Sequence, residues 1–133
     1  MGEEKRVKPN VEQVGPPRGP FTVRRNSAIT LEVKRSDDIA HIYLNDQWIG
    51  TRETRESGPL RISLEKLFKR GRNSLEIQCT DYGFGGANYW TLECQVKFED
   101  ALYPSLDLGW HHDRFGQNDV HATKGVTVLF DVQ

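Results

Sequence analysis

Apolar and polar residues alternate along most of the chain after Phe21, and this period of two constrains the fold more than any other feature. The alternation is present in six segments, at residues 29–34, 40–45, 60–64, 75–80, 90–98 and 126–132. Strict alternation is typical of β-strands that bury one face and expose the other. Short stretches with Gly, Pro, Asn and Asp separate these segments. The sequence therefore predicts an all-β fold, an antiparallel β-sandwich (jelly roll).

Two weaker segments bring the expected number of strands to eight or nine. Phe21 and Val23 begin the first of them, and the second covers residues 106–110, where apolar residues alternate with Asp and Gly. Helical spacing is found at Leu64, Leu67 and Phe68, which follow the i, i+3, i+4 pattern, and Gly71 marks its end. We therefore expect one short helical turn near 64–70.

The first 19 residues have a different character from the rest of the chain. They contain Pro9, Pro16 and Pro17, many charged residues and only isolated apolar ones. Such a composition cannot bury enough apolar surface to order itself. We expect a flexible N-terminal arm at 1–19 and one β-sandwich domain at 20–133, since 133 residues is the length of one ordinary domain.

Charge and hydropathy exclude several classes of function. The formal net charge is −1, without the basic excess that a general nucleic-acid-binding protein carries. The chain contains no apolar run of the roughly 20 residues that a membrane-spanning helix needs. The N-terminus lacks the apolar stretch of a secretory signal. We expect a soluble protein located in the cytoplasm rather than exported by the classical route.

A series of motifs between residues 36 and 80 resembles the galactose-binding-domain-like β-sandwich of carbohydrate-binding modules and glycoside hydrolase sugar-binding domains. The motifs are the acidic pair Asp37-Asp38, the hairpin Asn45-Asp46, and a Gly-x-Asn-x-Leu passage at residues 71–75. The family usually has Gly where this chain has Asp46. The resemblance implies a jelly-roll fold and sugar binding.

Strand reversals assign the connections of an antiparallel sandwich to its two ends. The turns at 25–27, 45–47, 65–71 and 99–104 should lie at one end, and the loops at 36–38, 53–58 and 81–88 at the other. If residues 106–110 form a strand, the loop at 111–124 joins the second group. Binding residues concentrate in loops that a rigid scaffold holds together.

The second group of loops is rich in the residue types that recognise sugars. Planar polar groups form paired hydrogen bonds to hydroxyls, and aromatic rings stack on the apolar face of a pyranose. The glycines at 83, 85 and 86 allow a ligand to approach the backbone closely. The candidate sugar-binding residues are Asp37, Arg52, Asp81, Tyr82, Asn88, Tyr89, Trp110, His111, His112 and Asp113.

Metal binding is the weaker interpretation of the same loops. Asp38, Asp81 and Asn88 are candidate calcium ligands, and an Asp and an Asn flanking a glycine-rich loop resemble the calcium site of some galactose lectins. Calcium takes six to eight oxygens, and these residues supply a minority. His111 and His112 point to opposite faces of an extended segment, so they rarely bind one ion together. We expect no cofactor.

Catalytic motifs are missing from the sequence. It has no nucleophile elbow, no zinc-protease helix motif and no phosphate-binding loop, so we predict that the chain is not an enzyme. Cys79 and Cys94 fall on the inward face of consecutive strands. We interpret them as buried small hydrophobes, with a cross-strand disulfide as the alternative.

The sequence favours a non-catalytic, lectin-like domain whose partner is carbohydrate. Single-site affinity should be weak, because hydrogen bonds to sugar largely replace hydrogen bonds to water, so use in nature would need multivalency, through a homo-oligomer for example. The alternative is a protein-interaction or structural domain of a larger assembly, with residues 1–19 as its tether. A metal-dependent hydrolase is a third hypothesis.

Overall fold

The computed structural model describes residues 7–53, 58–80, 90–113 and 123–133, with the backbone alone at residues 90 and 111–113. Ten strands and one 3-10 turn lie within these ranges. They are β1 (Glu12–Gln13), β2 (Arg18–Val23), β3 (Ile29–Asp37), β4 (Ile39–Leu44), β5 (Gln47–Arg52), β6 (Leu60–Ser63), η1 (Leu64–Lys66), β7 (Gly71–Thr80), β8 (Trp90–Phe98), β9 (Leu106–Asp113) and β10 (Thr123–Val132). Over the same ranges, no helix has the length and apolar character to cross a membrane.

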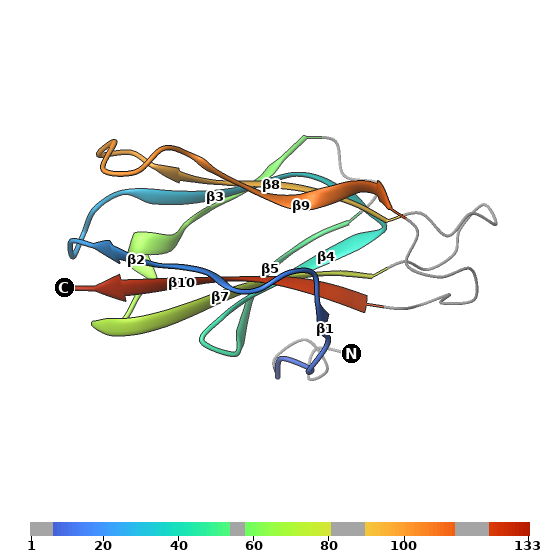
Figure 1. Cartoon of the computed structure of the whole chain (residues 1–133), viewed down its shortest axis with the longest axis horizontal. Coiled ribbons are helices and arrows are strands. Elements are labelled where there is room, and N and C mark those ends of the chain that lie inside the picture. Colours follow the sequence, from blue (N-terminus) through green and yellow to red (C-terminus); the bar gives the residue numbers. More distant parts are fainter. Residues whose placement is uncertain (1–6, 54–57, 81–89, 114–122) are drawn as a thin grey trace.

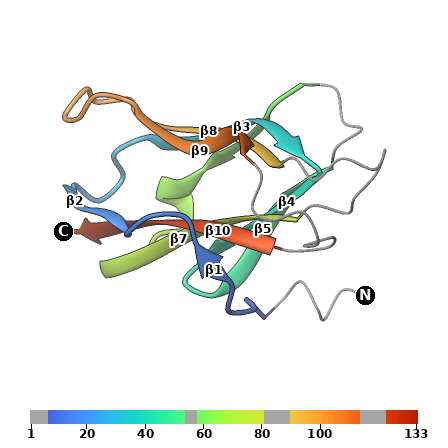
Figure 2. The same ribbon diagram turned by 45° about the vertical axis from the view of Figure 1, so that its right-hand side comes forward.

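The strands form two sheets that pack face to face, which confirms the predicted all-β sandwich (Figures 1 and 2). The larger sheet has the order β1-β10-β7-β4-β5, with β2 also paired to β10, and the smaller sheet has the order β6-β3-β8-β9. Neighbouring strands are antiparallel except that β1 and β2 run parallel to β10. The weakly predicted segments at 21–23 and 106–110 both lie in strands.

The core fills the space between the sheets with the inward residues that the alternation predicts. Leu31, Leu75, Ile77 and Phe130 are all completely buried. The helical turn predicted near 64–70 is present as the 3-10 turn η1, and its first residue, Leu64, is buried in the core.

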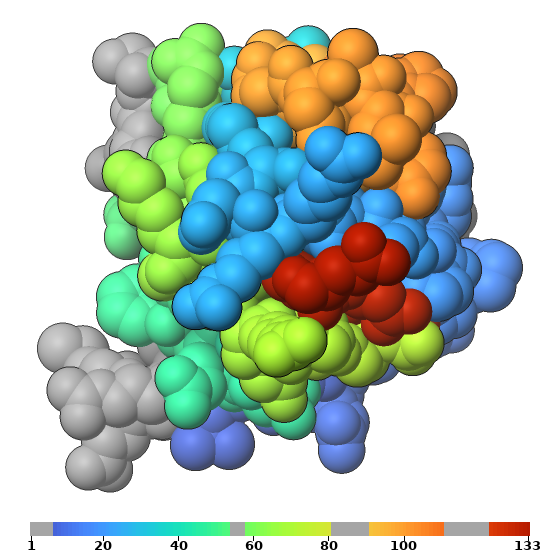
Figure 3. All heavy atoms as spheres, turned by 90° about the vertical axis from the view of Figure 1, so that its left-hand side faces the viewer, coloured from blue at the N-terminus to red at the C-terminus, as the bar shows by residue number. Residues whose placement is uncertain are grey.

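One end of the sandwich, which we call the closed end, brings together the turns near residues 25, 70 and 100 and the C-terminus (Figure 3). The Ser27 hydroxyl donates a 2.9 Å hydrogen bond to Asp100, and the Glu99 amide donates to the Ala28 carbonyl at 3.0 Å. These contacts join the 24–28 turn to the 99–105 turn. Three of the four turns predicted for one end, at 25–27, 65–71 and 99–104, therefore lie together.

Two asparagines explain physically why the motifs at 45–46 and 71–75 occur together. Asn45 and Asp46 have φ of 52° and 68°, as a type I′ hairpin requires, so Asp46 adopts the conformation for which Gly is usual. The Asn45 amide nitrogen donates to the Asn73 side-chain oxygen at 2.9 Å, and the Ser74 amide donates to Asn45 Oδ1 at 2.8 Å. The two motifs therefore lock the hairpin against the start of β7.

The N-terminal segment differs from the arm that its composition suggests. Residues 7–14, which we call the N-terminal strap, lie across the outer face of the larger sheet, and β1 pairs with β10. The Val14 amide donates to the Gly125 carbonyl at 2.8 Å, and the Pro9 carbonyl accepts from Gln78 at 2.9 Å. Residues 1–6 lie outside the described ranges.

The strap buries polar side chains that a solvent-facing sheet would expose. Tyr43, Glu76 and Gln78 are each 5% exposed or less, although all three point away from the core. The Lys8 ammonium donates to Glu76 at 3.0 Å, and Gln78 donates to the same carboxylate at 2.6 Å. Burial, with the charge of Glu76 beside it, raises the pKa of Tyr43 above its usual value. Tyr43 is therefore buried on the outward face of β4, next to Glu76, the residue that Lys8 of the strap contacts.

Replacing Lys8 with methionine is expected to lower the free energy of unfolding by about 1–3 kcal/mol, because Glu76 loses its cation while staying buried. Urea denaturation measures the loss. The exposed Lys66→Met variant, which keeps the strap, should change stability by less than about 0.5 kcal/mol. Equal stability of the Lys8→Met variant and the unmodified chain would show that the Lys8–Glu76 contact contributes nothing.

Candidate functional site

The strands that border the candidate sugar-binding loops end together at the end opposite the closed end (Figures 1 and 2). Thr80, the last residue of β7, pairs with Thr123, the first of β10, and their hydroxyls are 2.8 Å apart. Trp90, the first residue of β8, pairs with Asp113, the last of β9. We call this the loop end, and it is defined by the strand ends at Asp37, Arg52, Thr80, Trp90, Asp113 and Thr123.

The acidic pair lies at the loop end, where the chain crosses from one sheet to the other. Asp37 is exposed and pairs with Thr91 in β8, one residue after the strand begins. Asp38 is 3% exposed, and its amide donates to the Thr80 carbonyl at 3.1 Å. The pair therefore sits directly beside the exit of β7 and the entry of β8.

Two other candidates lie inside the sandwich at this end. Arg52 ends β5 with its side chain only 6% exposed. Trp110 is also 6% exposed and packs in the core, because it follows Leu106 and Leu108 on the inward face of β9. The Trp110 indole therefore packs in the core near the loop end and is not exposed to stack on a sugar ring.

The remaining candidates cannot be placed at the level of their side chains. Asp81, Tyr82, Asn88 and Tyr89 lie outside the described residues, so the sugar and calcium roles predicted for them stay predictions. The backbone of His111, His112 and Asp113 is in β9 at the loop end. No three His, Cys, Asp or Glu side chains within the described ranges are grouped so that they could hold a metal ion.

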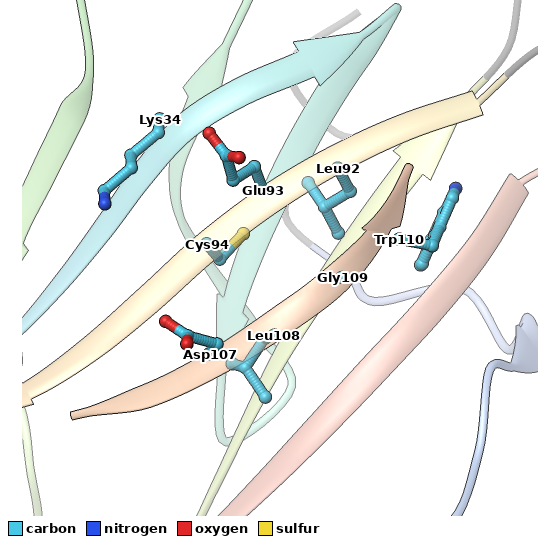
Figure 4. A pocket seen from close by; sticks show the side chains of 8 residues that line it. All are labelled: Lys34, Leu92, Glu93, Cys94, Asp107, Leu108, Gly109 and Trp110. Atoms are coloured by element: carbon cyan, nitrogen blue, oxygen red, sulfur yellow. The ribbon is translucent and has the colours of Figure 1, made fainter. Parts of the chain in front are cut away.

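A groove lies along the middle of β8 and β9, on the outer side of the smaller sheet, and the sequence patterns did not predict it. Its volume is about 330 Å³, and charged side chains of Lys34, Glu93 and Asp107 line it together with Gly109 (Figure 4). Gly109 has φ of 109°, and a Cβ there would lie 2.0 Å from the Leu92 carbonyl oxygen, so only glycine allows the strands to approach this closely. The sequence signal is the single glycine within an alternating strand.

The outer face beside this groove carries a cluster of charges centred on Glu32. Arg61 donates to the Glu32 carboxylate at 2.8 Å, and the Lys97 ammonium is 3.5 Å from it. Burial by itself raises the pKa of Glu32, but the Arg61 hydrogen bond and the Lys97 charge outweigh it, so the pKa lies below the ordinary 4.5.

The lowered pKa of Glu32 predicts a stability loss in acid. A carboxylate whose pKa is lower in the folded state stabilises the fold above its unfolded pKa, and this contribution disappears as the pH falls through the folded value. We expect Glu32→Gln to lose less stability than the unmodified chain between neutral pH and about pH 3, as urea midpoints would show. The exposed Glu99→Gln variant should follow the unmodified chain. Parallel pH profiles for all three proteins would contradict the assignment.

The two cysteines are buried thiols close to the loop end, and no disulfide joins them. The Cys79 thiol is 3.6 Å from the Asp37 carbonyl oxygen. Burial, followed by the nearby Cys79 and Glu93, raises the pKa of Cys94 far above its ordinary value, although the guanidinium of Arg52 acts in the opposite direction. Such thiols are poor nucleophiles, which fits a packing role.

Comparison with known proteins adds no identification. Neither a family model, nor a curated protein, nor a solved structure matches this chain.

Proposed function

We propose that this chain is a non-catalytic carbohydrate-binding domain that binds sugar at its loop end. One observation supports this most: the pairings of Trp90 with Asp113 and of Thr80 with Thr123 bring the borders of the 81–89 and 114–122 segments to the same end. Asp37 is exposed beside them. Acidic, amide, imidazole and aromatic groups from separate parts of the sequence would then face one ligand.

The resemblance to galactose-binding-domain-like modules between residues 36 and 80 points to the same function. The groove of Lys34, Glu93 and Asp107 lies on β8 and β9, the two strands that end at the loop end with Trp90 and Asp113. Carboxylate and ammonium groups are good hydrogen-bond partners for sugar hydroxyls, so this groove is the second surface to which we assign an oligosaccharide.

A glycan array probed with the full chain tests the proposal. The chain should be tetramerised on streptavidin, because the weak single-site binding we expect is detected only with avidity. Calorimetry with the bound glycan should then show affinities about 3- to 10-fold weaker for Asp37→Ala, Tyr89→Ala and His112→Ala, which is the scale of one lost hydrogen bond or ring contact. Glu99→Gln at the closed end is the matched control. An array without binding would overturn the proposal.

A protein-interaction domain is the second candidate, and an apolar surface at the start of the strap favours it. Val7 is 74% exposed and bridges to Gln47, next to Trp48, whose side chain is 40% exposed. Large apolar groups that remain exposed are typical of contact surfaces. Analytical ultracentrifugation should then show a dimer that Trp48→Ser weakens. A monomer at all concentrations would exclude self-association through this surface.

A further inference from the structure

Among the described residues, four cationic side chains and a single carboxylate line a pocket at the closed end. Arg25 comes from the turn after β2, and Lys66, Lys69 and Arg70 come from η1 and the chain that follows it, together with Glu65. The pocket has a volume of about 360 Å³, and we call it the basic pocket. The two segments that form it are far apart in the sequence but lie side by side on the face that Figure 3 shows.

The backbone around the basic pocket is held by contacts that do not use its cationic groups. Asn73 is completely buried, and its side chain accepts from the Lys69 amide at 3.0 Å and donates to the Lys69 carbonyl at 2.8 Å. The Ile29 amide donates to Glu65 Oε2 at 3.4 Å, which joins the start of β3 to η1. The cationic side chains therefore extend from a backbone that is already in place before a ligand binds.

Two side chains that pack against or within the core complete the lining. Phe68 is partly buried, and its ring lies 5.0 Å from that of Phe130, measured between ring centroids. Val132 is 6% exposed. Pockets of about 300–1,000 Å³ that combine apolar side chains with a few polar groups are typical of small-molecule sites. A ligand in the basic pocket would contact fixed apolar groups as well as charged ones.

The positive charge of the basic pocket is not balanced by the residues around it. Its four cations are exposed and form no ion pair with any described residue. Two carboxylates of the closed end are engaged elsewhere, because Asp131 pairs with Arg72 and Asp100 accepts from the Ser27 hydroxyl. The formal net charge of the whole chain is −1, so this local excess does not follow from its composition.

We propose that the basic pocket binds a small molecule that carries two or more phosphate groups. A phosphate group has a charge of about −1.5 to −2 at neutral pH, so a polyphosphate matches the excess positive charge better than a carboxylate does. The planar fork of an arginine binds two phosphate oxygens at once, and a lysine ammonium binds as a point charge. The site lies at the opposite end of the sandwich from the proposed sugar site and does not depend on it.

Calorimetry of the full chain with tripolyphosphate tests this assignment. We expect saturable binding of one tripolyphosphate per chain, weaker binding of inorganic phosphate, and a loss of affinity as added salt screens the charges. The double variant Arg25→Gln/Lys69→Gln should weaken the binding about tenfold or more, because charge-assisted hydrogen bonds are lost. Lys66→Gln/Arg70→Gln should have the same effect. Amide shifts in an NMR titration should be largest at residues 24–28 and 65–70.

The matched control removes two charges outside the pocket. Arg18 and Arg35 are exposed in β2 and β3, and Arg18→Gln/Arg35→Gln should change the affinity by less than about twofold. Without ligand, the melting temperatures of all these variants should stay close to that of the unmodified chain, because only exposed side chains change. Tripolyphosphate should raise the melting temperature of the unmodified chain and of the control, and not that of the pocket variants.

The outcomes separate this site from its alternatives. Equal affinity of the pocket variants and the control, or no saturation by tripolyphosphate, would overturn the proposal. Binding of single-stranded RNA without binding of tripolyphosphate would also overturn it and would assign the surface to nucleic acid. Vesicles of phosphatidylcholine with and without phosphatidylinositol bisphosphate distinguish a lipid headgroup, which binds through the pocket on the vesicle, from a soluble phosphate ligand. A chain that binds tripolyphosphate but no sugar supports this site and overturns only the proposed function.

Discussion

Replacing Phe130 with alanine should lower the free energy of unfolding by about 3–5 kcal/mol. Phe130 is completely buried in β10, and its ring lies 5.0 Å from that of Phe68 and 6.2 Å from that of Phe21, measured between ring centroids. Alanine removes these contacts and leaves a cavity that the surrounding strands can only partly close. Urea denaturation followed by tryptophan fluorescence measures the loss.

Two variants control for the Phe130 result. Phe130→Leu keeps most of the buried volume and should cost about 1–1.5 kcal/mol. Leu102→Ala removes a side chain that is 56% exposed and should change stability by less than about 0.5 kcal/mol. If Phe130→Ala were no more destabilising than Leu102→Ala, the closed end would not be packed as described.

Replacing Gly109 with alanine should lower the free energy of unfolding by roughly 2–5 kcal/mol, the sum of a strained backbone and a steric clash. The new Cβ would lie 2.0 Å from the Leu92 carbonyl oxygen, so β8 and β9 would have to separate. The groove beside Glu93 would change shape with them. Hydrogen exchange at the β8 and β9 amides measures the local loosening, and urea denaturation measures the total effect.

Gly71→Ala is the matched control for Gly109→Ala. Gly71 also has a positive φ, of 91°, but a Cβ there would have nothing within 4 Å. Only the backbone strain remains, and it should cost about 1–2 kcal/mol. Equal losses at the two glycines would contradict the close approach of β8 and β9.

The alternation predicts the sandwich well, because a strand with one buried face has a period of two that is visible within its own few residues. The inward residues of 29–33, 75–79 and 126–132 all belong to the core. The end of the sandwich at which each connection lies can also be predicted by counting strands, since each antiparallel strand reverses the direction of the chain. The tight hairpin at Asn45-Asp46 is also predictable locally, because these two residue types favour a two-residue turn between alternating segments.

Long-range contacts set the features that the alternation misses. Tyr43 occupies an outward position and is nevertheless buried, beside Glu76, which the strap contacts through Lys8. Lys8 finds its partner Glu76 across 68 residues, which no local pattern records. Arg52 is inside because a bulge shifts the β4–β5 register by one residue, and the position of a bulge depends on both strands.

The central claim is that sugar binds where the ends of β3, β5, β7, β8, β9 and β10 meet. The most direct test is an NMR titration of the ¹⁵N-labelled chain with the highest-affinity glycan of the array, in which the changes of the amide chemical shifts are measured. The account predicts that the largest shifts fall on Asp37, Arg52, Thr80, Thr91 and Thr123, with Asn26, Asn73 and Asp100 unmoved. Shifts concentrated at the 24–28 and 99–105 turns, or along the strap, would contradict it.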